Sequence, residues 1–167
     1  GAFSDRAGTA GLGKLGAKAR SAAWGDVNRD GFLDLVVGFG EQRPAQLCLS
    51  DRRGGFCEGL SLEGFKCAWG AAGLAFADFD NDGDLDLLVS GREAAGILVN
   101  EFPRLPDNPV KLAVRLPASE APGATVRLYD AADRLLGLRQ LGLIGNVNSQ
   151  EPPEAFFAVA PGKYKIA

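Results

Sequence analysis

Short runs in which hydrophobic residues alternate with polar or small residues occupy most of the first hundred positions. They lie at 22–25 (AAWG), 33–39 (LDLVVGF), 45–50 (AQLCLS), 74–77 (LAFA), 85–91 (LDLLVSG) and 96–100 (GILVN). An alternation with a period of two places successive side chains on opposite faces of a β-strand. The longest helix-like segment, 17–23 (AKARSAA), is too short to form a helix by itself. We therefore predict an all-β protein.

The runs belong to an internal repeat. Residues 21–40 (SAAWGDVNRDGFLDLVVGFG) align with residues 73–91 (GLAFADFDNDGDLDLLVSG), with the two acidic segments in register 52 positions apart. In each copy one strand enters an acidic loop, a second strand leaves it, and a third follows as a hairpin. A period near 50 residues built from short strands is typical of propeller blades. We predict two blade-like antiparallel units.

The two acidic loops, at 26–34 (DVNRDGFLD) and 78–86 (DFDNDGDLD), have the chemistry of a metal site. Oxygen-bearing side chains stand at loop positions 1, 3, 5 and 9, and glycine stands at position 6. Ca²⁺ prefers six to eight oxygen ligands in a flexible shell, and the glycine permits a left-handed turn around one point. The proposed side-chain ligands are Asp26, Asn28, Asp30 and Asp34 in the first loop and Asp78, Asp80, Asp82 and Asp86 in the second.

Position 7 differs between the copies, being Phe32 in the first loop and Asp84 in the second. If both loops bind an ion in the same way, this residue contributes its backbone carbonyl. We therefore predict two Ca²⁺ sites with five ligand residues each. The second site carries four charged side-chain ligands against three in the first, because Asn28 replaces an aspartate, and we expect it to bind Ca²⁺ more tightly.

Other interpretations of the loops are weaker. An EF-hand needs Glu at position 12 and a following helix, and dockerin loops also need an acidic residue there, but position 12 is Val37 or Val89 within a strand-like run. Asp-Gly turns without a metal need only one or two such residues. A pair of glycosidase carboxylates needs separate environments, which clustered loop carboxylates do not provide.

The segments AAWGDVNRDGFLDLVVG, AQLCLSDRRGGF, LAFADFDNDGDLDLLVSG and GILVN resemble the FG-GAP/VCBS repeats of integrin-type and bacterial secreted propellers. The resemblance covers residues 1–102, as units of about 1–54 and 55–102. It implies that the acidic loops bind Ca²⁺ for structural reasons, and that blade faces and loops bind partners. Two blades do not close a propeller. We expect either a fragment of a longer propeller or a partial one closed by oligomerisation or by the C-terminal part.

The last third of the chain has a different pattern. Residues 103–109 contain three prolines and are predicted to be a linker. Five candidate strands follow at 110–116, 124–130, 134–140, 155–160 and 163–167, which predicts a small antiparallel β module over 110–167. The segments KLAVRL and PGATVRLYD, Ser149-Gln150 and the pair Phe156-Phe157 resemble the ASPIC/UnbV domain, which follows such repeats in cartilage-acidic-protein-like proteins.

Composition excludes several function classes. Net charge is −3, and the longest basic run is Arg52-Arg53, so we expect no nucleic-acid partner. No apolar stretch is long enough to span a membrane. The chain has no His and 3 Cys, which removes the usual zinc ligands and the usual general base. For Cys48 and Cys57, which flank a predicted turn, a disulfide and a pair of free thiols both remain open.

These observations predict a non-enzymatic, calcium-stabilised interaction or adhesion module, secreted to an extracellular or periplasmic location. The partner is an unidentified protein or glycan, and a homo-oligomer is an option. The alternative is an accessory carbohydrate-binding domain of a secreted polysaccharide-active enzyme. That alternative needs exposed aromatic side chains, but Trp24 and Trp69 lie in strand-like runs and are expected in the core. The chain lacks methionine, so we expect a processed or trimmed piece.

Overall fold

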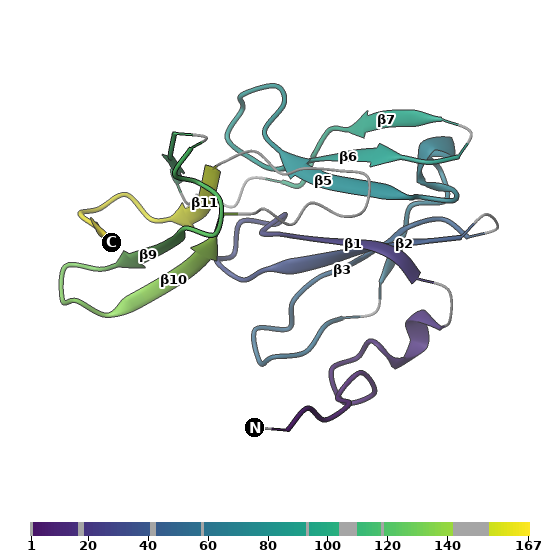
Figure 1. The fold of residues 1–167 in the computed structure, drawn as a ribbon, viewed down its shortest axis with the longest axis horizontal. Helices are drawn as coiled ribbons and strands as arrows, with labels where there is room; N and C mark the ends of the chain where they lie inside the picture. Colours follow the sequence, from purple (N-terminus) through teal and green to yellow (C-terminus); the bar gives the residue numbers. More distant parts are fainter. Residues whose placement is uncertain are drawn as a thin grey trace.

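A computed structural model describes residues 2–16, 19–40, 43–57, 59–92, 94–103, 110–117, 119–141 and 154–167. In these ranges the chain is all-β, as predicted, with four small antiparallel sheets and two short 3-10 helices, η1 (Gly13–Leu15) and η2 (Lys66–Ala68) (Figure 1). No helix in this part of the chain has the length and hydrophobicity that a membrane-spanning segment needs.

The two repeats form equivalent sheets. The first contains β1 (Ala19–Gly25), β2 (Asp34–Phe39), β3 (Gln46–Cys48) and β4 (Leu60–Ser61), and the second contains β5 (Gly73–Ala77), β6 (Asp86–Ser90) and β7 (Ala95–Leu98). Strands are neighbours in chain order in both sheets. Gly25 pairs with Asp34 in the first sheet, and Ala77 pairs with Asp86 in the second. The two acidic loops therefore begin and end at matching points of their sheets.

The two sheets pack on each other through one shared hydrophobic core. Ala23, Val36 and Leu47 come from the first sheet, and Leu74, Phe76, Leu87 and Val89 come from the second. The contact is close at Gly25, where a Cβ atom would lie 2.7 Å from Cδ2 of Phe76. A side chain at this position would overpack the interface.

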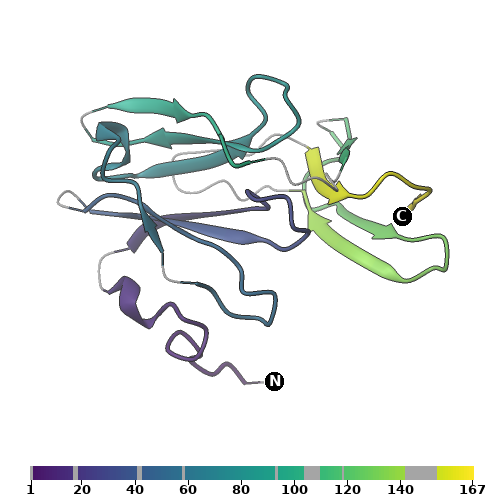
Figure 2. The same ribbon diagram turned by 180° about the vertical axis from the view of Figure 1, so that it is seen from behind.

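The opposite face of the first sheet is covered by the N-terminal segment. Leu35, Val37, Phe39 and Cys48 are buried there against Leu12, Leu15 and Phe56. Figure 2 shows this segment on the side of the first sheet that faces away from the second sheet. The central strand β2 is consequently covered on both faces, and every one of its residues is buried, whereas the outer face of β1 stays exposed.

The C-terminal residues form two further sheets. β9 (Thr125–Tyr129) lies between β10 (Leu135–Gln140) and β12 (Lys165–Ile166), while β8 (Val110–Arg115) pairs with β11 (Glu154–Val159). All five strands were predicted from the sequence. Phe157 packs in the core of this group, whereas its neighbour Phe156 packs against the core of the two repeats. β11 therefore belongs to the C-terminal group and also contacts the repeats. The predicted linker beyond Pro103, and Ser149-Gln150, lie outside the described residues.

The expected burial of the two tryptophans was wrong. Trp24 is 50% exposed and Trp69 is 38% exposed. Trp24 lies on the outer face of β1, where its ring contacts Phe56 at a centroid distance of 5.8 Å. Trp69 follows η2, and its Nε1 donates to the Glu63 carbonyl at 3.3 Å. The alternation of hydrophobic and polar residues along a strand does not predict which face of the strand an adjoining sheet covers.

The three cysteines are free thiols in the structure. The turn predicted at Arg52-Arg53 is present, with Ser50 bridged to Phe56 across it. In this register the amide of Cys57 donates to the carbonyl of Leu49 at 2.8 Å, so Cys57 lies opposite Leu49 instead of Cys48. A shift of one residue places the two sulfur atoms on opposite faces. The structure therefore favours the free-thiol alternative.

Candidate metal centre

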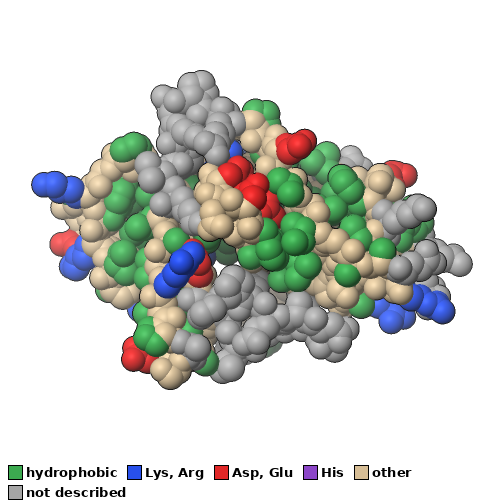
Figure 3. Space-filling view, turned by 90° about the horizontal axis from the view of Figure 1, so that it is seen from above, with side chains coloured by type: hydrophobic (Ala, Val, Ile, Leu, Met, Phe, Trp, Pro, Cys, Tyr) green, Lys and Arg blue, Asp and Glu red, His purple; other side chains and the backbone are tan. Residues whose placement is uncertain are grey.

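The two acidic loops emerge from the same end of the repeats. β1 and β5 are in contact, and each leads directly into its loop. A small pocket is lined by Asp26 and Arg29 of the first loop, Asp84 of the second loop, and Phe156 and Phe157 of β11. The loops are therefore near each other and against the C-terminal group. Seen from above, acidic side chains gather near the middle of the face, beside hydrophobic side chains (Figure 3).

The loops share one backbone conformation. Gly31 and Gly83, at position 6, have φ of 88° and 102°, and Arg29 and Asn81, at position 4, have φ of 59° and 62°. This left-handed region is open to glycine and is tolerated by a single Asn, but it is strained for arginine. The predicted glycine turn is present in both copies.

The aspartate at position 9 holds each loop to its sheet. Asp34 Oδ2 accepts from the Val27 amide at 2.9 Å, and its Oδ1 accepts from the Ser50 amide at 2.8 Å. Asp86 repeats the pattern: Oδ2 accepts from the Phe79 amide at 2.8 Å, and Oδ1 accepts from the Asn100 amide at 2.9 Å. Asp34 is 0% exposed and Asp86 is 1% exposed. The sequence pattern indicated a ligand here but gave no sign of this structural role.

In the first loop the acidic groups are held by hydrogen bonds within the repeat. Asp26 accepts from the amides of Asp30 and Gly31, both at 2.9 Å. Asn28 Oδ1 accepts from the Asp30 amide at 3.1 Å. Asp30 Oδ2 forms an ion pair with Arg52 Nε at 3.0 Å. An arginine from the adjacent hairpin therefore compensates part of the negative charge of this loop.

In the second loop the carboxylates converge. One oxygen from each of Asp78, Asp80 and Asp86 lies within 4.8 Å of the others. Oxygens that share a Ca²⁺ ion at 2.3–2.6 Å are at most about 5 Å apart. The three aspartates of the first loop, all of them described, do not form such a group. Asp82 is exposed and stands apart from the group. The donor set of the second loop, oxygen alone, fits a hard divalent cation.

Position 7 is used differently in the two copies. Phe32 is 45% exposed, whereas Asp84 is 3% exposed. Asp84 Oδ2 lies 3.5 Å from Nη1 of Arg29, which is 8% exposed and belongs to the first loop. The Asp84 carboxylate is therefore paired with a protein cation. This arrangement leaves its backbone carbonyl as the group that position 7 can offer an ion.

Burial affects the acidity of several loop residues. Desolvation raises the pKa of Asp26 to about 6, opposed by the hydrogen bond from the Gly31 amide. Desolvation also raises the pKa of Asp84 to about 6, with repulsion from Asp82 adding to it and Arg29 opposing it. The pKa of Asp34 is raised by burial as well. Burying carboxylates without a strong counter-charge costs free energy, and a bound cation would offset that cost.

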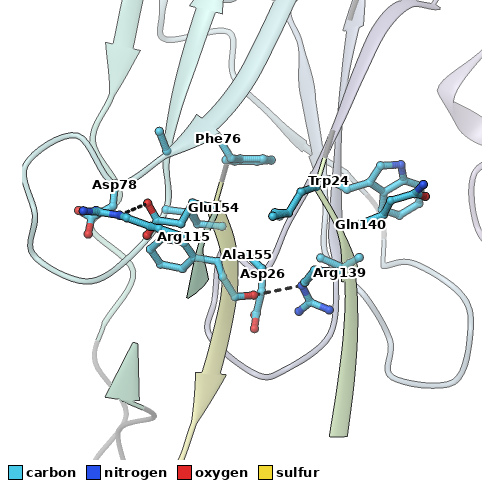
Figure 4. A pocket seen from close by; sticks show the side chains of 15 residues that line it. Trp24, Asp26, Phe76, Asp78, Arg115, Arg139, Gln140, Glu154 and Ala155 are labelled. Atoms are coloured by element: carbon cyan, nitrogen blue, oxygen red, sulfur yellow. Dashed lines mark hydrogen bonds and ion pairs between the residues drawn. The ribbon is translucent and has the colours of Figure 1, made fainter. Parts of the chain in front are cut away.

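A cavity of about 180 Å³ lies between the repeats and the C-terminal group. It is lined by Asp26 and Asp78, the first residues of the two loops, and by Trp24, Phe76, Arg115, Arg139, Gln140, Glu154, Ala155 and others. In Figure 4 the Arg115–Glu154 ion pair, at 2.8 Å, lies on one side of Ala155, and Arg139 lies on the other. Arg139 Nε donates to the Phe156 carbonyl at 3.1 Å. Nothing in the sequence pattern indicated that these residues meet.

Comparison with known proteins adds one finding. No curated protein gives a match to the chain. The family model described as FG-GAP repeat matches residues 19–42, a range that spans β1, the first acidic loop and β2. The chain therefore contains an FG-GAP repeat at residues 19–42.

Proposed function

We propose that the chain is a calcium-stabilised interaction module without catalytic activity. The convergence of Asp78, Asp80 and Asp86 carries this proposal, because three carboxylate oxygens within 4.8 Å repel one another unless a cation lies between them. The FG-GAP match to the first copy supports it, since such repeats generally serve interaction and often bind Ca²⁺. In this proposal each loop binds one ion, through the side chains at positions 1, 3, 5 and 9 and the carbonyl of Phe32 or Asp84.

Calcium has a structural role in this proposal. The ion neutralises loop carboxylates that burial disfavours, and it fixes the connection between two strands of each sheet. The second loop fills first because its ligands already converge and carry more negative charge. Asp26 of the first loop is held by backbone amides, and Asp30 is paired with Arg52, so these two ligands must exchange partners.

The proposal also covers the location, the domain organisation and the partner. FG-GAP repeats are typically extracellular, which supports a secreted, extracellular or periplasmic location. Strand content at the predicted segments supports repeat units at about 1–54 and 55–102 and a β module at 110–167. The linker at 103–109 rests on its three prolines, and the ASPIC/UnbV-like character of the module rests on the sequence resemblance. The partner is a protein or glycan, bound by the chain alone or as a homo-oligomer.

A thermal melt with Ca²⁺ and with a chelator tests the calcium proposal. An ion present at 100 times its Kd stabilises the folded protein by about 2.7 kcal/mol, which for a chain of this size raises Tm by about 5–10 °C. Mg²⁺ serves as the control, because it demands a tighter octahedral shell. Asp80→Ala, which removes one side-chain ligand of the second loop, should reduce the shift, whereas Asp80→Asn recreates the ligand set of the first loop and should reduce it less. An identical Tm in Ca²⁺ and chelator would refute the proposal, and solution mass measured in parallel reports any oligomer.

Carbohydrate binding is a second candidate function, and the exposure of Trp24 favours it. Its half-exposed indole borders a cavity that also presents Gln140, Arg139 and Glu154, which are side chains able to hydrogen-bond sugar hydroxyls. A glycan-array screen followed by tryptophan fluorescence titration tests this candidate. Trp24→Ala should abolish binding, while Trp69→Ala, which removes the other exposed indole, should not. No glycan binding in the screen, or equal loss in both variants, would refute it.

A further inference from the structure

The two loops differ most at positions 4 and 7, the positions that the proposed side-chain ligands do not use. Position 4 is Arg29 in the first loop and Asn81 in the second, and position 7 is Phe32 in the first and Asp84 in the second. At these two positions each loop has one charged residue that its counterpart lacks. These two residues have opposite charges.

The structure brings these two charged residues together. Arg29 Nη1 lies 3.5 Å from Asp84 Oδ2, and both side chains are more than nine-tenths buried. Arg29 Nη2 also donates to the carbonyl of Phe102, at the end of the second repeat, at 3.4 Å. A buried ion pair of this kind costs several kcal/mol to break by removing one partner. The tip of the first loop is therefore tied to the second.

Asn100 provides an independent connection between the same loops. Its Nδ2 donates to the Val27 carbonyl in the first loop at 2.9 Å and to the Leu85 carbonyl in the second at 3.1 Å. Its backbone amide donates to Asp86 Oδ1, so the same residue also holds the position-9 aspartate of the second loop. The equivalent contact in the first repeat comes from the Ser50 amide alone.

We propose that the Arg29–Asp84 pair couples the two loops, so that Ca²⁺ in one loop raises the affinity of the other. This inference rests on the proposed function. An ion in the first loop fixes residues 26–34 and with them the guanidinium of Arg29. A fixed guanidinium compensates Asp84 next to Asp82 and Asp86, so the second loop holds its ligands in place more readily. By reciprocity the second ion favours the first to the same extent. Arg29 and Asp84 are positioning residues, and neither side chain contacts the ion.

Calorimetric Ca²⁺ titration of the full chain measures the coupling. Asp30→Asn disables the first loop, and the affinity of the second is then compared with wild type. We expect a loss of at least fivefold, the lower end of typical coupling between sites. In the background R29Q/D84N, which keeps the wild-type net charge but lacks the pair, Asp30→Asn should weaken the second loop less than it does with the pair present, because only the Asn100 connection remains; an equal loss in both backgrounds would overturn the role of the pair. Arg53→Gln removes one charge from an exposed arginine of the neighbouring turn and should leave the fivefold coupling intact.

A second measurement needs no metal. In chelator, urea unfolding of wild type, Arg29→Gln, Asp84→Asn and the double variant forms a double-mutant cycle, and a pair that joins the loops makes the two substitutions non-additive. Two results would overturn the coupling alone. One is Ca²⁺ binding at two independent sites. The other is tighter Ca²⁺ binding after Arg29→Gln, once the effect of Arg53→Gln, which removes the same charge, has been subtracted. Absence of Ca²⁺ binding at both loops would overturn the proposed function and the coupling with it.

Discussion

Replacement of Asp86 separates a structural role from a metal-binding role at position 9. The carboxylate is 1% exposed and accepts from the Phe79 and Asn100 amides at 2.8 and 2.9 Å. Asp86→Ala removes both acceptors, while Asp86→Asn keeps one carbonyl oxygen. Both variants also lose the charge that a bound ion would use. Measurement without metal removes the contribution of the ion and leaves the two hydrogen bonds, partly offset by relief of the repulsion from Asp78 and Asp80.

The size of the effect follows from the two hydrogen bonds. A hydrogen bond to a charged acceptor contributes about 1.5–3 kcal/mol, so loss of both in Asp86→Ala should lower the free energy of unfolding by about 3–6 kcal/mol. Asp86→Asn should cost about half as much. With a urea slope of about 2 kcal/mol/M, the alanine variant should unfold at a midpoint about 2 M lower.

Urea denaturation in chelator, followed by circular dichroism, gives these values. Asp80→Ala is the matched control, because Asp80 is another aspartate of the same converging group but is exposed. In chelator it should cost less than about 1 kcal/mol. In Ca²⁺ both variants should lose the stabilisation that the ion gives to wild type. Equal stability of Asp86→Ala and wild type in chelator would refute the structural role.

Three further predictions address other parts of the loops and the repeat interface. Because burial raises the pKa of Asp26 to about 6 from an ordinary 3.8, the folded protein binds this proton more tightly than the unfolded chain. Without metal, Asp26 should lower stability by about 3 kcal/mol as pH rises from about 4 to 7, and Asp84, whose pKa burial also raises to about 6, adds a slope of the same sign. In urea melts Asp26→Asn should reduce the slope by about 1.4 kcal/mol per pH unit, and an unchanged slope would contradict this. Asn28→Asp adds a fourth charged ligand to the first loop and should tighten its Ca²⁺ binding several-fold by calorimetry, whereas equal affinities would contradict the charge argument. Gly25→Ala places a Cβ 2.7 Å from Phe76 Cδ2 and should lower the free energy of unfolding in urea by about 1–3 kcal/mol. Gly64→Ala is the control and should be neutral, because a Cβ there has no neighbour within 4 Å. Similar values for both variants would refute the close contact.

Strands and loops could be predicted from the sequence because both depend on local patterns. The alternation at 33–39 and 85–91 defined β2 and β6 to within a residue or two, and the duplicated motif placed an acidic loop before each. The left-handed turn at Gly31 and Gly83 followed from the absence of a Cβ. These features require no knowledge of how the sheets pack.

Features that depend on packing could not be predicted. The pairing of Arg29 with Asp84, and the contact of Arg139 with the Phe156 carbonyl, join segments whose proximity is set by the stacking of sheets. A hydrophobic alternation with a period of two predicts that the two faces of a strand differ, but it does not predict which face packs against another sheet. The exposure of Trp24 was missed for this reason. Comparison of the two loops predicted that the Asp84 side chain is not needed at an ion, and the structure pairs this side chain with Arg29.

The link from Asn100 to the first loop has a consequence for the order of folding during synthesis. The Asn100–Val27 hydrogen bond spans 73 residues. At a synthesis rate of about 5–20 residues per second, Asn100 is made roughly 4–15 s after Val27. Helix and hairpin formation take microseconds, so the first sheet has time to form while its loop still lacks this partner. The nascent first repeat thus spends seconds with an acidic loop that only the end of the second repeat completes.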